Sequence, residues 1–179
     1  MKFRELGADE IECRVGMVSK QGKGLSLLLY KDARCDSNIL DETIGPENWQ
    51  CRFYEQKGTL FCSLGVRIAR EDGTSEWVWK DDAGSPSNME AQKGEASDAR
   101  KRAGFAWGIG RELYTAPFIW VNSDKCNLFQ RGNGYACNDS FKVAKIRIDE
   151  NPETGRRKIT GIRIVNERTG QIAFSWKEA

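Results

Sequence analysis

Residues 60–80, LFCSLGVRIAREDGTSEWVWK, decide how this 179-residue chain folds. Apolar side chains occupy every second position from Leu60 to Ile68, and this alternation predicts a half-buried β-strand. The pair Asp72-Gly73 follows, and Asp-Gly supplies the positive φ angles that a tight hairpin turn requires. Alternation then resumes at residues 76–80. The stretch therefore predicts a β-hairpin.

Further elements are predicted on both sides of this hairpin. A third strand over residues 49–53 precedes it. A helix is predicted before that strand, capped by Asp32 and stopped by Gly45-Pro46, and its buried face is expected at Ala33, Ser37, Leu40 and Ile44. A second helix is predicted from about Met89 to Tyr114, with an alanine stripe that lets it lie close to a sheet, at Ala96, Ala99, Ala103 and Ala106. Its glycines indicate close backbone contact or a helix that ends near Gly108.

The two ends of the chain also show β-patterns. Strands over residues 11–17 and 25–29 predict an N-terminal β-hairpin. Residues 115–140 are rich in Asn, Ser and Gly and are expected to form a loop, whereas 141–179 predict a three-stranded β-meander with a bulge in its first strand. The expected fold class is α+β: an antiparallel sheet with an α-β-β-β-α core, an order also found in double-stranded-RNA-binding domains. We expect a single domain over residues 1–179, with its core at 30–114.

Composition excludes several chemistries. The chain has no histidine, which rules out Ser-His-Asp hydrolases, Cys-His proteases and His-ligated zinc enzymes. No Walker loop is present, and Gly108-Ile109-Gly110 follows a helix and not a strand, so it is no dinucleotide fingerprint. No apolar run approaches the ~18 residues of a membrane helix, and Met1–Glu10 lacks the apolar segment of a secretory signal. We expect the chain to stay in the cytosol or nucleus.

The six cysteines do not form a C-x-x-C pair, so zinc-ribbon and thioredoxin-like sites are not indicated. Cys13, Cys51 and Cys62 fall in phase with apolar strand positions and are expected to be reduced core thiols. Cys126 and Cys137 lie in the predicted loop, where a clamp by a metal ion or a disulfide is an open alternative.

Charge is unevenly distributed although the formal net charge is only +2. The charged residues in segment 71–92 are mostly acidic, whereas those in segments 93–111 and 142–177 are mostly basic. The second helix carries Lys93, Arg100 and Arg111 on one face, with Lys101 at its border. Such a row of cations suits the phosphates of a nucleic-acid strand, because each contact releases condensed counterions. The alternative is a solvated helix face.

Aromatic residues and carboxylates leave two further alternatives open. Trp77, Trp79 and Trp107 could stack on unpaired bases, but the expected role of all three is in the core. A second group resembles the carboxylate and lysine set of Mg²⁺-dependent nucleases, although its spacing is generic: Glu76, Lys80, Asp81 and Asp82.

The segments KGEASDARKRA (93–103) and WGIGRELY (107–114) resemble the Rad52 family of single-strand annealing proteins, most of all its short phage and bacterial members. The segments ILDE (39–42), IGPENW (44–49) and WKDDAG (79–84) resemble that family as well. The resemblance covers roughly residues 30–120. It implies an α-β-β-β-α core that assembles into rings, with a basic groove that holds single-stranded DNA by its backbone and leaves the bases outward.

The resemblance also implies particular groove residues. Lys101 and Arg102 match the family's Lys-Arg pair on the groove-lining helix, and Lys93 matches a basic position two turns earlier. Arg34 lies within one residue of the family's groove arginine on the first helix. A further family arginine has no counterpart, because Phe105 stands in its place.

The sequence therefore predicts an oligomeric, ATP-independent protein that binds and anneals single-stranded DNA in homologous recombination and double-strand break repair. The expected nucleic-acid-binding residues are Lys101, Arg102, Lys93, Arg100, Arg111 and Arg34. No catalytic residue, metal site or cofactor is expected. Expected partners are single-stranded DNA and further copies of the chain, with a single-strand-binding protein or a recombinase as additional candidates, in the cytoplasm of a bacterium or a phage-infected host. The alternatives are an RNA- or double-stranded-RNA-binding module and the Mg²⁺-dependent nuclease.

Overall fold

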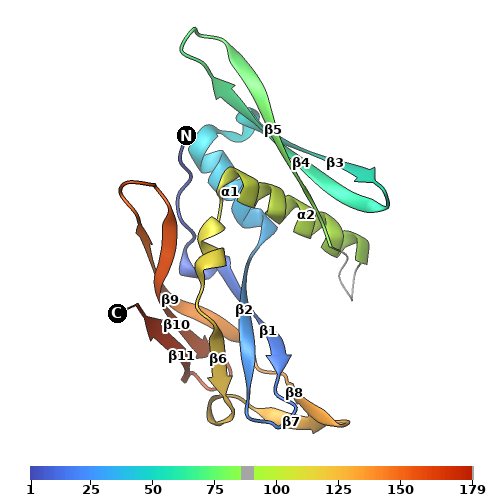
Figure 1. Cartoon of the computed structure of the whole chain (residues 1–179), viewed down its shortest axis with the longest axis vertical. Coiled ribbons are helices and arrows are strands. Elements are labelled where there is room, and N and C mark those ends of the chain that lie inside the picture. Colours follow the sequence, from blue (N-terminus) through green and yellow to red (C-terminus); the bar gives the residue numbers. More distant parts are fainter. Residues whose placement is uncertain (86–90, 179) are drawn as a thin grey trace. The chain divides into compact units, whose positions relative to one another are not determined.

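In a computed structural model of the chain, which describes residues 1–85 and 91–178 and only the backbone at Ala33 and residues 91–93, the alternating run forms the central strand of a three-stranded antiparallel sheet. The sheet order is β3 (Trp49–Gln56), β4 (Thr59–Ala69) and β5 (Ser75–Ala83) (Figure 1). Side chains at every second position of β4 are fully buried, namely Cys62, Leu64 and Val66. Gly73 turns β4 into β5 with a φ of 81°, as the Asp-Gly pair predicts.

Helix α1 (Ala33–Ile44) begins and ends where its capping residues predict. The Asp32 carboxylate accepts a hydrogen bond from the backbone N–H of Arg34 at 2.9 Å, and Gly45 ends the helix with a φ of 84°. The buried face differs from the expected one, because the adjacent apolar residues Ile39 and Leu40 turn inward together. Ser37 and Ile44 are therefore only half-buried.

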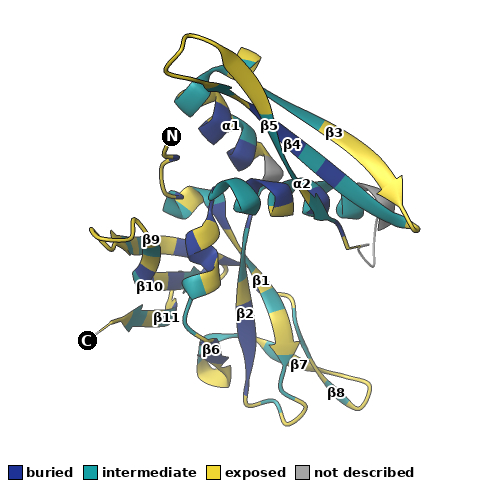
Figure 2. Ribbon diagram, turned by 45° about the horizontal axis from the view of Figure 1, so that its top comes forward, coloured by how far each residue is buried: buried dark blue, intermediate teal, exposed yellow. Residues whose placement is uncertain are grey.

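Helix α2 (Ala91–Trp107) packs on β4 and β5 through its alanine stripe, where Ala99 and Ala103 are fully buried. The helix ends at Trp107 and does not extend to Tyr114, because Gly108 and Gly110 take φ angles of 98° and 72° that a right-handed helix excludes. Its expected start at Met89 lies outside the described residues. Figure 2 shows buried positions along α1, α2 and the middle of β4, whereas most of β3 is exposed.

The chain divides into two compact units, each built from two separate stretches. The first unit comprises Met1–Arg4 and Asp32–Gly110, and thus contains α1, β3, β4, β5 and α2. The second unit comprises Glu5–Lys31 and Arg111–Ala179. The described structure is thus α+β with antiparallel sheets and two α-helices.

The second unit contains a six-stranded antiparallel sheet in the order β11-β10-β9-β1-β2-β6. The predicted hairpin and meander both form, and β1 joins them by pairing with β9 at Cys13 and Phe141. The register between β9 and β10 shifts next to Val143, in agreement with the expected bulge. The strand bounds are β1 (Ile11–Val18), β2 (Gly24–Lys31), β6 (Ile119–Asn122), β9 (Phe141–Glu150), β10 (Arg157–Asn166) and β11 (Ile172–Lys177).

The prediction of a loop over residues 115–140 is wrong, because this segment contains β6 and a separate two-stranded sheet. That sheet pairs β7 (Leu128–Arg131) with β8 (Gly134–Cys137). All three strands have only four residues, so the Asn, Ser and Gly of the intervening turns dominate the composition. In the parts of the chain that the structure describes, no helix is both long and apolar enough to cross a membrane.

Candidate nucleic-acid interface

Two of the expected binding residues act on the same carboxylate in the first unit. Arg34 Nη2 lies 2.7 Å from Asp32 Oδ2, and its side chain is 89% exposed. This hydrogen bond, with that from the backbone N–H of Arg34, lowers the pKa of Asp32, and the positive charge of Lys101 lowers it further. Lys101 lies on the side of α2 opposite the buried alanine stripe. Arg34 on α1 and Lys101 on α2 thus both act electrostatically on Asp32.

Arg102, the next residue of α2, is paired with a carboxylate of the sheet. Its Nε lies 3.1 Å from Asp82 Oδ1, and both side chains keep a third or more of their surface exposed. Asp82 also accepts a hydrogen bond from the backbone N–H of Ala83 at 2.8 Å. The pairing of Asp82 with Arg102 could not be expected from the sequence, since it joins residues 20 positions apart.

Arg100 is directed between α1, α2 and β3. Its guanidinium donates to the Ser37 hydroxyl and lies 5.4 Å from the centre of the Trp49 ring. Its Nε is buried with no hydrogen-bond partner within the described structure. Arg100 therefore connects α1 and β3 to α2, and like Lys101 it is half-buried, whereas Arg102 is exposed.

The remaining two expected residues are placed differently. The backbone of Lys93 lies in the first turn of α2, and its side chain lies outside the described residues. Arg111 does not share a helix face with Arg100, because α2 ends at Trp107. Arg111 instead opens the 3₁₀-helix Arg111–Thr115 and belongs to the second unit.

The three tryptophans have different environments. Trp107 is half-buried and contacts the sheet: its Nε1 donates to the Leu64 carbonyl at 2.9 Å, and Lys80 Nζ lies 4.4 Å from its ring centre. Trp79 is half-buried. Trp77 is 37% exposed, so its expected place in the core is wrong. The alternation along β5 shows that Trp77 and Trp79 share one face of the strand, but it cannot show which face of the sheet a helix covers.

The sheet separates Asp81 from the other residues of the nuclease alternative, Glu76, Lys80 and Asp82. Asp81 and Asp82 are successive strand residues and project from opposite faces. Lys80 donates to the Ala106 carbonyl at 3.0 Å, and Glu76 pairs with Arg70. Tyr54 donates to Asp81 at 3.0 Å on the other face. This geometry gives no convergent set of carboxylates with a lysine.

None of the six cysteines forms a disulfide. Cys62 is buried as expected, whereas Cys13 and Cys51 are only half-buried. The Sγ atoms of Cys51 and Cys62 lie 3.1 Å apart, and the hydrogen bond between them, with the nearby charge of Arg100, lowers the pKa of Cys51 to about 7. Burial raises the pKa of Cys126 to about 11. No cluster of three or more His, Cys, Asp or Glu side chains suited to a metal ion occurs among the described residues.

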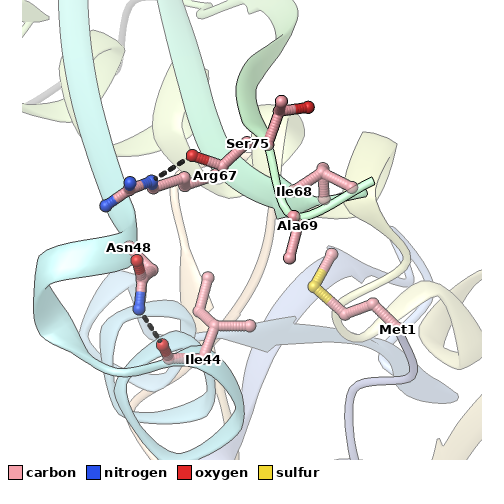
Figure 3. A pocket seen from close by; sticks show the side chains of 9 residues that line it. Met1, Ile44, Asn48, Arg67, Ile68, Ala69 and Ser75 are labelled. Atoms are coloured by element: carbon pink, nitrogen blue, oxygen red, sulfur yellow. Dashed lines mark hydrogen bonds between the residues drawn. The ribbon is translucent and has the colours of Figure 1, made fainter. Parts of the chain in front are cut away.

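A pocket of about 560 Å³ lies between the end of α1 and the β4–β5 turn (Figure 3). Ile44, Ile68 and Met1 contribute apolar surface. Its polar groups are satisfied locally, since Asn48 donates to the Ile44 carbonyl at 2.7 Å and Arg67 Nε donates to Ser75 at 2.8 Å. The pocket therefore presents no array of convergent polar groups for a small ligand.

Comparison with known proteins identifies the family of this chain. Residues 4–127 match the model of the Rad52/22 family double-strand break repair protein. The chain therefore belongs to the Rad52/22 family, which confirms the resemblance drawn from its motifs. The match also includes the N-terminal hairpin, where the sequence shows no recognisable motif.

Curated relatives are similar over part of their length. The single-stranded DNA-binding protein DdrA of Deinococcus radiodurans is 34% identical over 98 residues, which cover 55% of this chain and 45% of that protein. DdrA of Deinococcus deserti is 29% identical over 116 residues, covering 64% of this chain and 55% of that protein. The chain thus spans about half the length of these relatives. No solved structure gives a significant match.

Proposed function

We propose that this protein binds single-stranded DNA and anneals complementary strands during double-strand break repair by homologous recombination. Family membership and the names of the DdrA relatives support this proposal. The structural observations that support it are the Arg34–Asp32 ion pair at 2.7 Å and the charge of Lys101, on the neighbouring helix α2, which acts on the same carboxylate. Two cations at one place on the first unit form a site for a phosphate.

The proposed mechanism is electrostatic. Each phosphate neutralised by Lys101, Arg34 or Arg102 releases counterions, and this supplies affinity that does not depend on base sequence. Asp32 and Asp82 hold the arginines in position before DNA binds, and a phosphate then competes with these carboxylates. Cations that grip the backbone leave base edges accessible, so Watson–Crick pairing between two bound strands determines which strands anneal.

The proposal includes several features that follow from the family resemblance. The order α1, β3, β4, β5 and α2 is proposed to be the family's α-β-β-β-α annealing core, and the two units are proposed to act together as one annealing domain. The protein is proposed to act without catalysis or ATP, as an oligomeric ring. A single-strand-binding protein or a recombinase is the proposed additional partner.

Substitution of Lys101 tests the proposed phosphate contact. Lys101→Ala should weaken binding to an oligo-dT strand and reduce the slope of log affinity against log salt concentration by about one, because one phosphate contact is lost. Lys20→Ala is the control, since Lys20 is an exposed lysine in the β1–β2 turn. Unchanged affinity and slope in Lys101→Ala would contradict the assignment of the interface.

Annealing is measured separately with two complementary fluorescent oligonucleotides in buffer without ATP or Mg²⁺. The wild-type protein should accelerate their pairing, and Lys101→Ala should do so less. Preferential binding of an RNA duplex over single-stranded DNA would instead support the RNA-binding alternative. Cleavage of the oligonucleotides on addition of Mg²⁺ would support the nuclease alternative.

A further inference from the structure

The β3–β4–β5 sheet has a second face, opposite the one on which α2 packs. Strand pairing places Trp79 opposite Gly65 and Trp77 opposite Arg67 on this face, whereas Leu64 and Val66 point toward α2. We call this second surface the outer face. Its aromatic and charged members are Arg52, Tyr54, Phe61, Arg67, Trp77, Trp79 and Asp81.

A glycine allows one indole to lie flat on the outer face. A Cβ atom at Gly65 would meet the Trp79 ring at 2.7 Å, so the ring covers the position where another residue would project. The guanidinium carbon of Arg52 lies 4.2 Å from the Trp79 ring centre. The planar cation of Arg52, an exposed residue of β3, thus lies over the indole of Trp79 on β5.

Other aromatic rings extend this surface along the sheet. The rings of Trp77 and Trp79 are 6.1 Å apart, and those of Tyr54 and Phe61 are stacked at 5.4 Å with an angle of 12° between their planes. Trp77 and Tyr54 are 37% and 39% exposed. At about 3.3 Å per strand residue, the distance from Trp77 to the end of β5 is roughly 20 Å, enough for a few nucleotides of an extended strand.

The charge of the outer face is complementary to that of DNA. Arg52 and Arg67 are both exposed, and neither forms an ion pair within the described residues. Asp81 is the acidic residue of this face, and it accepts a hydrogen bond from the Tyr54 hydroxyl at 3.0 Å. Exposed aromatic rings beside arginines are the combination that binds unpaired bases by stacking and phosphates by charge.

We propose that the outer face is a second contact surface for single-stranded DNA, on which Trp77 and the Arg52 guanidinium, which lies over the Trp79 ring, stack against bases. This inference rests on the proposed function and adds a base-dependent component to it. The cations of α1 and α2 bind the backbone of a strand, whereas the outer face binds exposed bases. An unpaired strand has accessible base faces and a duplex does not, so this surface selects strands that are ready to anneal.

The test compares an oligo-dT 20-mer with an abasic 20-mer of the same charge. The wild-type protein should bind oligo-dT more tightly, and Trp77→Ala and Trp79→Ala should each lose this preference, with about ten-fold weaker binding to oligo-dT. Their salt slope should stay unchanged, because stacking releases no counterions. Phe129→Ala is the matched control, since Phe129 on β7 is also 37% exposed. Circular dichroism melting and native mass are recorded for each variant.

The outcomes separate this inference from the proposed function. If the wild-type protein binds neither oligonucleotide, the proposed function itself fails. If it binds both equally, or if the tryptophan variants keep the preference for oligo-dT, only the outer-face contact is overturned. If Trp77→Ala changes the native mass and leaves the base preference intact, the outer face contacts another copy of the chain and the inference is wrong.

Discussion

At the scale of single residues, the proposed function implies that carboxylates compete with DNA for the cations of α2. Asp82 holds Arg102 at 3.1 Å, and Asp32 is acted on by both Arg34 and Lys101. A positive charge that already has a carboxylate nearby gains less from a phosphate. In the proposed interface these acids therefore set how strongly DNA is bound, although they are not part of the family's basic motif.

Neutralising Asp82 should strengthen binding. Asp82→Asn keeps the shape and the acceptor for the backbone N–H of Ala83 but removes the charge opposite Arg102. Exposed ion pairs contribute about 0.2–1 kcal/mol, so affinity for oligo-dT at low salt should rise by a factor of roughly 1.5–5. The measurement is a salt titration of fluorescence anisotropy.

Asp149→Asn provides the matched control for this variant. Asp149 pairs with Arg147 at 3.1 Å in the second unit, and the two side chains have comparable or greater exposure. Equal gains in the two variants would indicate a general effect of net charge. No gain in Asp82→Asn would show that Arg102 does not meet a phosphate.

At the scale of elements, the position of the interface depends on how closely α2 docks against the end of β5. Gly84 follows β5 and is buried, and a Cβ atom there would lie 2.2 Å from the Glu95 carbonyl oxygen of α2. The Glu95 carboxylate also accepts a hydrogen bond from the backbone N–H of Leu60 at 3.1 Å. These contacts tie the N-terminal part of α2 to two strands.

Enlarging Gly84 should destabilise the first unit. Gly84→Ala forces backbone atoms apart, and such overpacking costs about 1–3 kcal/mol, so the midpoint of thermal unfolding should fall by several degrees. Gly134→Ala is the control, because Gly134 has no atom within 4 Å of an added Cβ. Equal midpoints for Gly84→Ala and the wild-type protein would contradict the close docking of α2.

At the scale of the whole molecule, each unit contains two stretches of sequence, so the chain crosses between units at residues 4–5, 31–32 and 110–111. The family-matched segment, residues 4–127, includes parts of both units. A truncation at residue 110 therefore cannot isolate the second unit, and the full chain is the appropriate material for every assay proposed above.

The proposed ring predicts a large native mass. In the three-stranded sheet β3 and β5 are edge strands, each paired only with β4 in the described chain, and such edges offer backbone groups to another copy. Native mass spectrometry should therefore give a multiple of 20.2 kDa, and electron microscopy with oligo-dT should show closed or open rings. A monomer at micromolar concentration, with and without oligo-dT, would contradict the oligomeric proposal.

Much of the local structure could be predicted from the sequence. The Asp32 cap, the Asp72-Gly73 turn and the alternation of β4 all depend on neighbouring residues, and each appears where it is expected. The second helix does not reach Tyr114, and the alternative that it ends near Gly108 is confirmed, because Gly108 and Gly110 take positive φ angles. The four-residue strands at 119–137 have too few positions for alternation to be recognised.

By itself, the sequence determined the order of most helices and strands, the cationic character of residues 93–111 and the family, because hydrophobic period, capping and motif spacing are properties of consecutive residues. Only the tertiary structure decided that β1 pairs with β9, that Arg100 is directed toward Ser37 and Trp49, that Asp82 faces Arg102, and that Trp77 is exposed. These features arise from contacts between residues far apart in the chain. The spacing of residues within a strand or helix cannot specify which distant surface covers each face.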